Sequence, residues 1–195
     1  DYGNGGDFLY RWGNPQAYKQ GAEADRTLFG QHYPHVIADG LDDAGKLMIF
    51  NNGNGRSPEY SEVIIINPPT TGPGVYDYTS NTAYGPTSTD YSYSDQSTDP
   101  SEFFSAIVSS AQRLGNGNIL ICEGRSGEIF EIDSNGNIVW KYRNPVDNIN
   151  GTISSQGNAP PTVGILFRAI KYAPDFPAFT GRNLTPGPPI ELNPN

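Results

Sequence analysis

Short segments in which apolar, aromatic and charged residues alternate recur along this chain. The order apolar–aromatic–charged–aromatic occurs at residues 9–12, 75–78 and 139–142, with spacings of 66 and 64 residues. The outer two copies extend further, since 8–15 (FLYRWGNP) aligns with 138–145 (IVWKYRNP). Alternation of this kind is what a β-strand with two differently packed faces requires. The repeat therefore indicates one β unit used several times, each copy burying its apolar face against a neighbour.

Each repeat divides into four predicted strands separated by turn signals. The predicted strands cover residues 36–37, 46–50, 62–67 and 75–78 in the first repeat, and 111–114, 118–123, 128–133 and 138–142 in the second. Asn-Gly pairs within 51–56, at 116–117 and at 135–136 favour tight turns between them. Four antiparallel strands per repeat are typical of one blade of a β-propeller.

The predicted fold class is therefore all-β, with propeller blades of four antiparallel strands over residues 1–172. Residues 8–15 are predicted to be the last strand of a preceding repeat, and 166–172 a returning strand that closes the ring. Residues 79–102 are dominated by Ser, Thr, Tyr and Asp and are predicted to form a long polar loop. Residues 173–195 are Pro-rich and are predicted to be an extended tail along the surface.

Charge and apolar content exclude two classes of partner. The chain has 21 acidic and 12 basic residues, a net charge of −9, and its basic residues do not cluster, so binding to nucleic acid or to an anionic membrane is not expected. No apolar run approaches the roughly 20 residues of a membrane helix. The single cysteine, Cys122, ends an apolar run and is predicted to be a small buried hydrophobic residue. The chain opens within a repeat and without Met, which indicates a piece of a longer precursor.

Both histidines of the chain lie in one short segment, at His32 and His35. Imidazole serves as base, nucleophile or ligand near neutral pH, although a structural role for both rings remains open. Three residues apart in an extended segment, the rings are expected on opposite faces, so they are not expected to act on one atom. Arg56 ends the turn after the next strand, where a guanidinium either binds an oxyanion through paired hydrogen bonds or holds its own turn.

The sequence has no motif typical of a metal site, a serine nucleophile or a nucleotide cofactor. No third histidine and no second cysteine completes a zinc site, and the acidic residues within 79–102 lack the spacing of a calcium loop, so no metal is expected. The serines of FFSAIVSSAQ (103–112) have no Gly-X-Ser-X-Gly elbow around them. The glycines lie in turns rather than in a phosphate or dinucleotide pattern, so no cofactor is expected.

Two units of the chain resemble the arylsulfotransferase family of bacterial secreted propellers. The first is GQH (30–32) followed by LMIFNNGNGR (47–56), and the second is AQRLGNGNILICEG (111–124) followed by EIFEIDSNGNIVWKY (128–142). The resemblance implies a six-bladed propeller, which at this repeat length needs about 390 residues. The chain then holds about two blades and parts of their neighbours, and its partner is the remainder of the ring, encoded upstream.

The same resemblance implies an activity and its residues. The family's nucleophilic histidine falls on His32, which takes a sulfuryl group from an aryl sulfate as a sulfohistidine and passes it to a phenol. Arg56 is the expected oxyanion contact, and Gln31, His35 and Asn52 are the expected substrate contacts. The position equivalent to His32 in the next repeat is Val108, so no second site is expected. The family's location is secreted or periplasmic.

Two other functions remain open at this point. A non-catalytic extracellular propeller, acting in binding, homo-oligomerisation or surface assembly, is favoured by the long loop 79–102 and by the extended tail. A glycan-decorated structural protein is the third hypothesis, because Asn150 and Asn183 each begin an Asn-X-Thr acceptor triplet.

Overall fold

The computed structural model describes residues 8–94, 99–155, 158 and 164–191. The described part is all-β, with antiparallel sheets, and its only helices are short 3₁₀ turns. These are η1 (Pro15–Tyr18), η2 (Glu23–Asp25), η3 (Pro100–Glu102) and η4 (Pro177–Phe179). No helix among these residues has the length and apolar character needed to cross a membrane.

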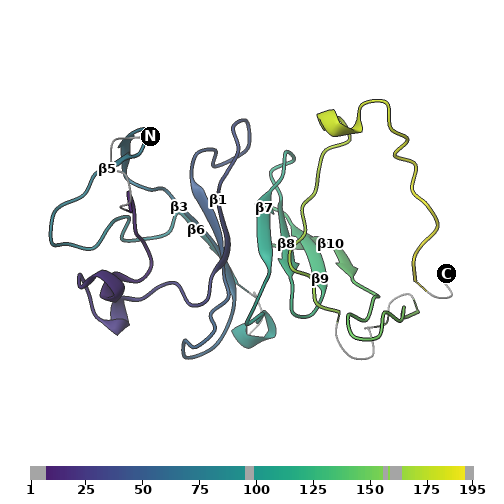
Figure 1. Cartoon of the computed structure of the whole chain (residues 1–195), viewed down its shortest axis with the longest axis horizontal. Coiled ribbons are helices and arrows are strands. Elements are labelled where there is room, and N and C mark those ends of the chain that lie inside the picture. Colours follow the sequence, from purple (N-terminus) through teal and green to yellow (C-terminus); the bar gives the residue numbers. More distant parts are fainter. Residues whose placement is uncertain (1–7, 95–98, 156–157, 159–163, 192–195) are drawn as a thin grey trace.

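Two four-stranded antiparallel sheets make up the body of the molecule (Figure 1). The first has the order β1-β2-β3-β6 and consists of β1 (His32–Val36), β2 (Leu47–Asn51), β3 (Glu62–Ile66) and β6 (Tyr91–Tyr93). The second has the order β10-β9-β8-β7 and consists of β7 (Ser110–Arg113), β8 (Ile119–Glu123), β9 (Glu128–Ile132) and β10 (Ile138–Arg143). β1 and β7 are edge strands of their sheets, and β1 and β2 lie against β7.

The core follows from strict alternation along the central strands. On β2, Met48 and Phe50 enter the larger apolar cluster, which they share with Ile119 and Ile121 of β8, while Ile49 turns to the opposite face. The larger cluster therefore joins the facing surfaces of the two sheets. The smaller cluster covers the other face of the first sheet, where the side chains of the N-terminal segment pack. Burial on both faces explains why β2 and β3 read as almost continuous apolar runs.

The fourth strand of the first sheet differs from the prediction. Residues 75–78 do not pair with β3; β5 (Val75–Tyr76) instead forms a separate small hairpin with β4 (Thr70–Gly72). β6 takes the predicted place from within the supposed loop 79–102, because Tyr93 inserts into the large cluster and is 6% exposed. Burial of this aromatic ring outweighs the local similarity of Val75–Tyr76 to the other repeats.

Two further predicted strands are also wrong. Residues 8–15 form no strand ladder; Tyr10 and Trp12 pack on the smaller cluster and donate side-chain hydrogen bonds to the carbonyls of Gly85 and Pro86. Residues 166–172 form no strand either, but they run along β7 through hydrogen bonds with its side chains, for example between the backbone of Lys171 and the amide of Gln112. Beyond them, residues 173–190 are almost wholly exposed and arch away from the sheets (Figure 1).

Two buried side chains, Cys122 and Glu131, have shifted pKa values for different reasons. Cys122 is 1% exposed, and burial raises the pKa of its thiol to about 12, as expected of an inert core residue. Glu131 is 5% exposed but accepts hydrogen bonds from Asn116, Asn118 and Lys171. The hydrogen bond from Lys171 is the largest cause that lowers the pKa of Glu131 to about 2.

Glu131→Gln is expected to lower stability at neutral pH and to have no effect in strong acid. A carboxyl whose folded pKa lies below its unfolded value stabilises the fold above the unfolded pKa, and this contribution disappears as the pH falls from about 4.5 to about 2. Because the Lys171 side chain is 54% exposed, solvent screening reduces the contribution to about 1–2 kcal/mol. Urea unfolding of both proteins between pH 2 and pH 7 measures the difference.

Glu123 provides the control with the opposite sign. Burial raises the pKa of its carboxyl to about 7, so its cost to the fold is absent below about 4.5 and grows as the pH rises to 7. Glu123→Gln should therefore match the parent protein at pH 4 and exceed its stability at pH 8. If both variants shift stability in the same direction across this range, the assignment of the two carboxyls is wrong.

Candidate active site

His32 begins β1, at a point where the ladder with β2 is irregular. The register shifts between His32 and His35, and Tyr33 between them has a φ of +50°. His32 is half-buried, and its Nδ1 lies 2.7 Å from Oδ1 of Asn52 and 3.0 Å from the carbonyl oxygen of Gly30. The irregular backbone thus presents one edge of the imidazole ring to two protein oxygens.

Asn52, which follows β2, is held in a single orientation. Its side chain is fully buried, and its Nδ2 donates to the carbonyl oxygens of Ser105 at 2.6 Å and Val108 at 3.0 Å. With both amide hydrogens directed at carbonyls, Oδ1 is left as the acceptor for His32. The two groups facing Nδ1 are therefore both acceptors, so Nδ1 carries the proton of the neutral ring and Nε2 keeps its lone pair.

Asn51 does not contact His32 but holds the segment before β1. Its Oδ1 accepts from the backbone N–H of Phe29 at 2.8 Å, while its Nδ2 donates to the carbonyl of Thr27 and to Glu62. These bonds fasten the segment before β1 to the first sheet, which places His32 opposite Asn52. An amide suits this position, because an aspartate would set a second carboxylate against that of Glu62.

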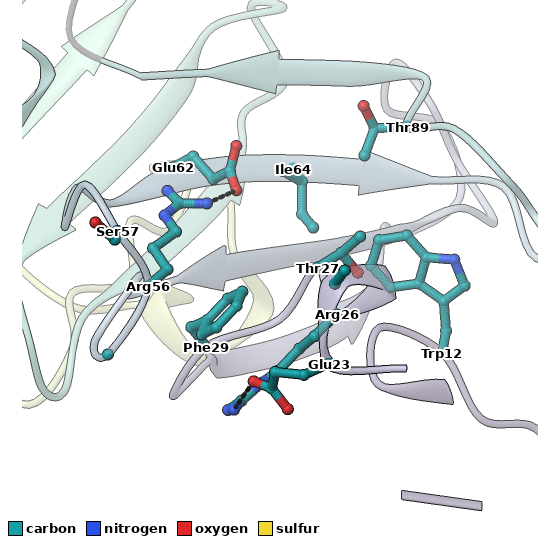
Figure 2. Close-up of a pocket in the computed structure, with 12 residues that line it drawn as sticks. Trp12, Glu23, Arg26, Thr27, Phe29, Arg56, Ser57, Glu62, Ile64 and Thr89 are labelled. Atoms are coloured by element: carbon teal, nitrogen blue, oxygen red, sulfur yellow. Dashed lines mark hydrogen bonds and ion pairs between the residues drawn. The ribbon is translucent and has the colours of Figure 1, made fainter. Parts of the chain in front are cut away.

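Both terminal nitrogens of Arg56 bind groups of its own turn, as Figure 2 shows for the contact with Glu62. Nη1 lies 2.7 Å from Oε1 of Glu62, Nη2 donates to the carbonyl of Tyr60 at 2.6 Å, and the guanidinium lies over the Tyr60 ring. Nε is buried without a hydrogen-bond partner. The geometry matches the alternative in which Arg56 holds the turn that follows Asn52.

The pocket drawn in Figure 2 lies beside this turn, and His32 is not among its lining residues. It has a volume of about 590 Å³ and is bounded by Trp12 and Phe29, by the Arg56–Glu62 ion pair and by Ile64 on β3. Its other arginine, Arg26, pairs with Glu23 at 3.3 Å. Both cations at this pocket therefore already face carboxylates.

The other predicted contacts are not gathered around His32. Gln31 is exposed, and His35 directs its Nδ1 to the carbonyl of Tyr33, against whose ring it packs at 4.6 Å. Of the five predicted residues, only His32 and Asn52 are joined by a hydrogen bond.

Sequence reasoning missed the groups that hold Asn52. The carbonyls of Ser105 and Val108 lie 53 and 56 residues further along the chain, and a backbone carbonyl has no residue signature. The one signal was the repeat itself, because Val108 occupies the position equivalent to His32. The structure brings these equivalent positions into one hydrogen-bonded cluster at the adjoining ends of β1 and β7.

A family model described as arylsulfotransferase (ASST) matches residues 14–145, which is more than half of the chain. No curated protein and no solved structure matches. The match includes both His32 and Asn52.

Proposed function

We propose that this chain, which belongs to the arylsulfotransferase (ASST) family, transfers sulfuryl groups from an aryl sulfate to a phenol through a sulfohistidine at His32. One observation carries the proposal: the bond between His32 Nδ1 and Asn52 Oδ1 leaves the lone pair on Nε2. A neutral imidazole with an available nitrogen is a competent nucleophile near neutral pH.

The reaction divides into two displacements at sulfur. Nε2 attacks the sulfur of the aryl sulfate, the N–S bond forms as the S–O bond to the aryl group breaks, and a phenolate leaves with the electron pair. The sulfated ring is cationic, and its Nδ1–H points at the oxygens of Asn52 and Gly30, which stabilise that charge. The oxygen of the acceptor phenol then attacks the same sulfur, and the new O–S bond forms as the N–S bond breaks with its electron pair returning to Nε2. The phenol proton passes to solvent, and His32 is again neutral.

The remaining residues take supporting roles in this proposal. Gln31 and His35 are offered as contacts to the substrates, since both belong to the segment that carries His32. Arg56 and Glu62 hold the turn next to Asn52 through their 2.7 Å ion pair, so Arg56 acts on the site through that turn. No metal or cofactor enters the chemistry.

The proposed setting is a β-propeller in which residues 1–172 supply blades and 173–195 the tail. Two observations support it. Both sheets have four antiparallel strands that lie side by side in chain order, with the β4–β5 hairpin inserted before the last strand of the first sheet. Their first strands, β1 and β7, are edge strands at adjoining positions. Further blades would come from polypeptide outside this chain. A secreted or periplasmic location is part of the same proposal and rests on family membership.

Incubation with a ³⁵S-labelled aryl sulfate, followed by quenching and peptide mapping, tests the proposal. The label is expected on the peptide that contains His32, in an acid-labile and base-stable linkage, as a sulfur–nitrogen bond on imidazole requires. His35→Asn should keep the label at saturating aryl sulfate, because the loss of a substrate contact weakens binding but leaves the nucleophile His32 in place. Label on a tyrosine or serine, or none at all, would refute the mechanism and favour a non-catalytic binding or assembly protein.

A further inference from the structure

The loop of residues 105–109, which leads into β7, joins the His32 site to the second sheet. Two of its carbonyls, those of Ser105 and Val108, accept the hydrogen bonds that orient Asn52. The loop also carries two hydroxyls, on Ser105 and Ser109, whose residues are 0% and 2% exposed. Neither hydroxyl contacts His32, so any effect on the imidazole must pass through Asn52.

These two hydroxyls belong to one chain of hydrogen bonds, and Oγ of Ser109 also lies 3.4 Å from the carbonyl oxygen of Ile107. The backbone N–H of Gly124 donates to Oγ of Ser109 at 2.9 Å, and Ser109 donates to Oγ of Ser105 at 2.9 Å. Oγ of Ser105 also accepts from the N–H of Arg125 at 3.0 Å and donates to the carbonyl of Ile107 at 3.0 Å. These bonds fasten the loop to the turn between β8 and β9, and Oγ of Ser61 holds its other side by accepting from the N–H of Ser105 at 2.9 Å.

The backbone of the loop requires such support. Val108 and Ser109 have φ values of +55° and +88°, a region that residues with a side chain adopt only when their surroundings impose it. The N–H of Ser109 is held by the carbonyl of Phe167 at 3.1 Å. The unusual conformation turns the carbonyl of Val108 towards Asn52.

We propose that Ser105 and Ser109 are positioning residues that fix His32 in its Nδ1–H tautomer by holding the loop carbonyls against Asn52. The kinetic consequence of this arrangement rests on the proposed function, whereas the tautomer itself does not. Without the hydroxyl chain the loop relaxes, the two carbonyls leave Nδ2, and the Asn52 amide is free to rotate its NH₂ group towards the ring. The imidazole then gains the tautomer with the proton on Nε2, which has no lone pair for attack on sulfur.

Ser109→Ala tests the proposal, with Ser110→Ala as the matched control. Ser110 is 1% exposed and its hydroxyl makes two hydrogen bonds with the backbone of Ala169, so its loss removes comparable bonds outside the loop. Ser109→Ala is expected to lower kcat by about 10–100-fold at unchanged KM, as removal of an orienting partner does elsewhere. Ser110→Ala is expected to leave kcat within about twofold, because it touches no group that orients Asn52.

¹⁵N NMR with labelled histidine reads the tautomer directly, and His35→Asn assigns the two rings. The parent protein should show the His32 proton on Nδ1, Ser109→Ala a growing share on Nε2, and Ser110→Ala no change. The proposal is overturned by an unchanged tautomer in Ser109→Ala, or by a parent ring protonated on Nε2. Should Ser109→Ala fail to fold, the Asn52 side-chain amide protons of the parent protein decide: slow solvent exchange supports the proposal, and free exchange refutes it.

The same measurements separate this inference from the proposed function. A tautomer that responds to Ser109→Ala in a protein without sulfuryl transfer leaves the positioning chain intact and refutes only the activity. Turnover that persists unchanged in Ser109→Ala, with an unchanged tautomer, refutes the positioning chain and leaves the activity in place.

Discussion

The His32→Asn variant is expected to lose sulfuryl transfer almost completely. Asparagine places no nucleophilic nitrogen at the position of Nε2, and loss of a covalent nucleophile in other enzymes lowers kcat by about 10⁴–10⁶-fold. Because the ring is half-buried and leaves the Asn52 contacts to Ser105 and Val108 in place, stability should change by less than about 1 kcal/mol. Release of nitrophenolate in the presence of a phenol acceptor measures turnover, and urea unfolding measures stability.

His35→Asn is the matched control for this experiment. As a substrate contact, His35 would affect binding and raise KM while kcat stays near that of the parent protein. Retention of more than a tenth of the turnover by His32→Asn, or equal losses in the two variants, would contradict the assignment of His32 as nucleophile.

Gly53→Ala is expected to destabilise the fold by at least about 3 kcal/mol. Gly53 follows Asn52 and has a φ of +74°, and an added Cβ would lie 1.8 Å from the carbonyl oxygen of Tyr60. That carbonyl is a backbone group which also accepts a hydrogen bond from Arg56, so it has little freedom to move. The clash adds to the intrinsic cost of a left-handed backbone conformation, and the midpoint of urea unfolding should fall accordingly.

Gly55→Ala separates these two contributions. Gly55 has a φ of +88°, but a Cβ there meets nothing within 4 Å. Its replacement should cost only the backbone term, about 1–2 kcal/mol. Equal losses in the two variants would show that the close approach of Tyr60 to Gly53 carries no energetic weight.

Local patterns predicted the strands that lie in the middle of each sheet. The apolar run at residues 62–67 corresponds to β3, and the hairpin signals at 116–117 and 135–136 lie between β7 and β8 and between β9 and β10. These elements are recognisable because alternation and Asn-Gly turns act over a few residues. The strand predicted at residues 8–15 is wrong, because Tyr10 and Trp12 are held by side-chain hydrogen bonds to residues more than 70 positions away.

The candidate site also combines residues that the sequence indicated with contacts that only the fold creates. His32 and Asn52 were identified from the Gln-His and Asn-Gly units, through their resemblance to a family, and the structure joins them by one hydrogen bond. The oxyanion role of Arg56 stays a prediction. Its pairing with Glu62 and with the carbonyl of Tyr60, which favours the turn-holding alternative, arises only where the turn folds back and has no signal in the local sequence.

By itself, the amino-acid sequence determined the all-β class with antiparallel sheets and the central strands of those sheets. Period-two alternation and turn residues are properties of a few neighbouring residues, so they can be recognised in the sequence alone. Only the tertiary structure decided that β6 completes the first sheet and that the loop before β7 holds Asn52. Both depend on contacts across tens of residues, in which buried carbonyls and hydroxyls must find partners wherever the packed sheets bring them.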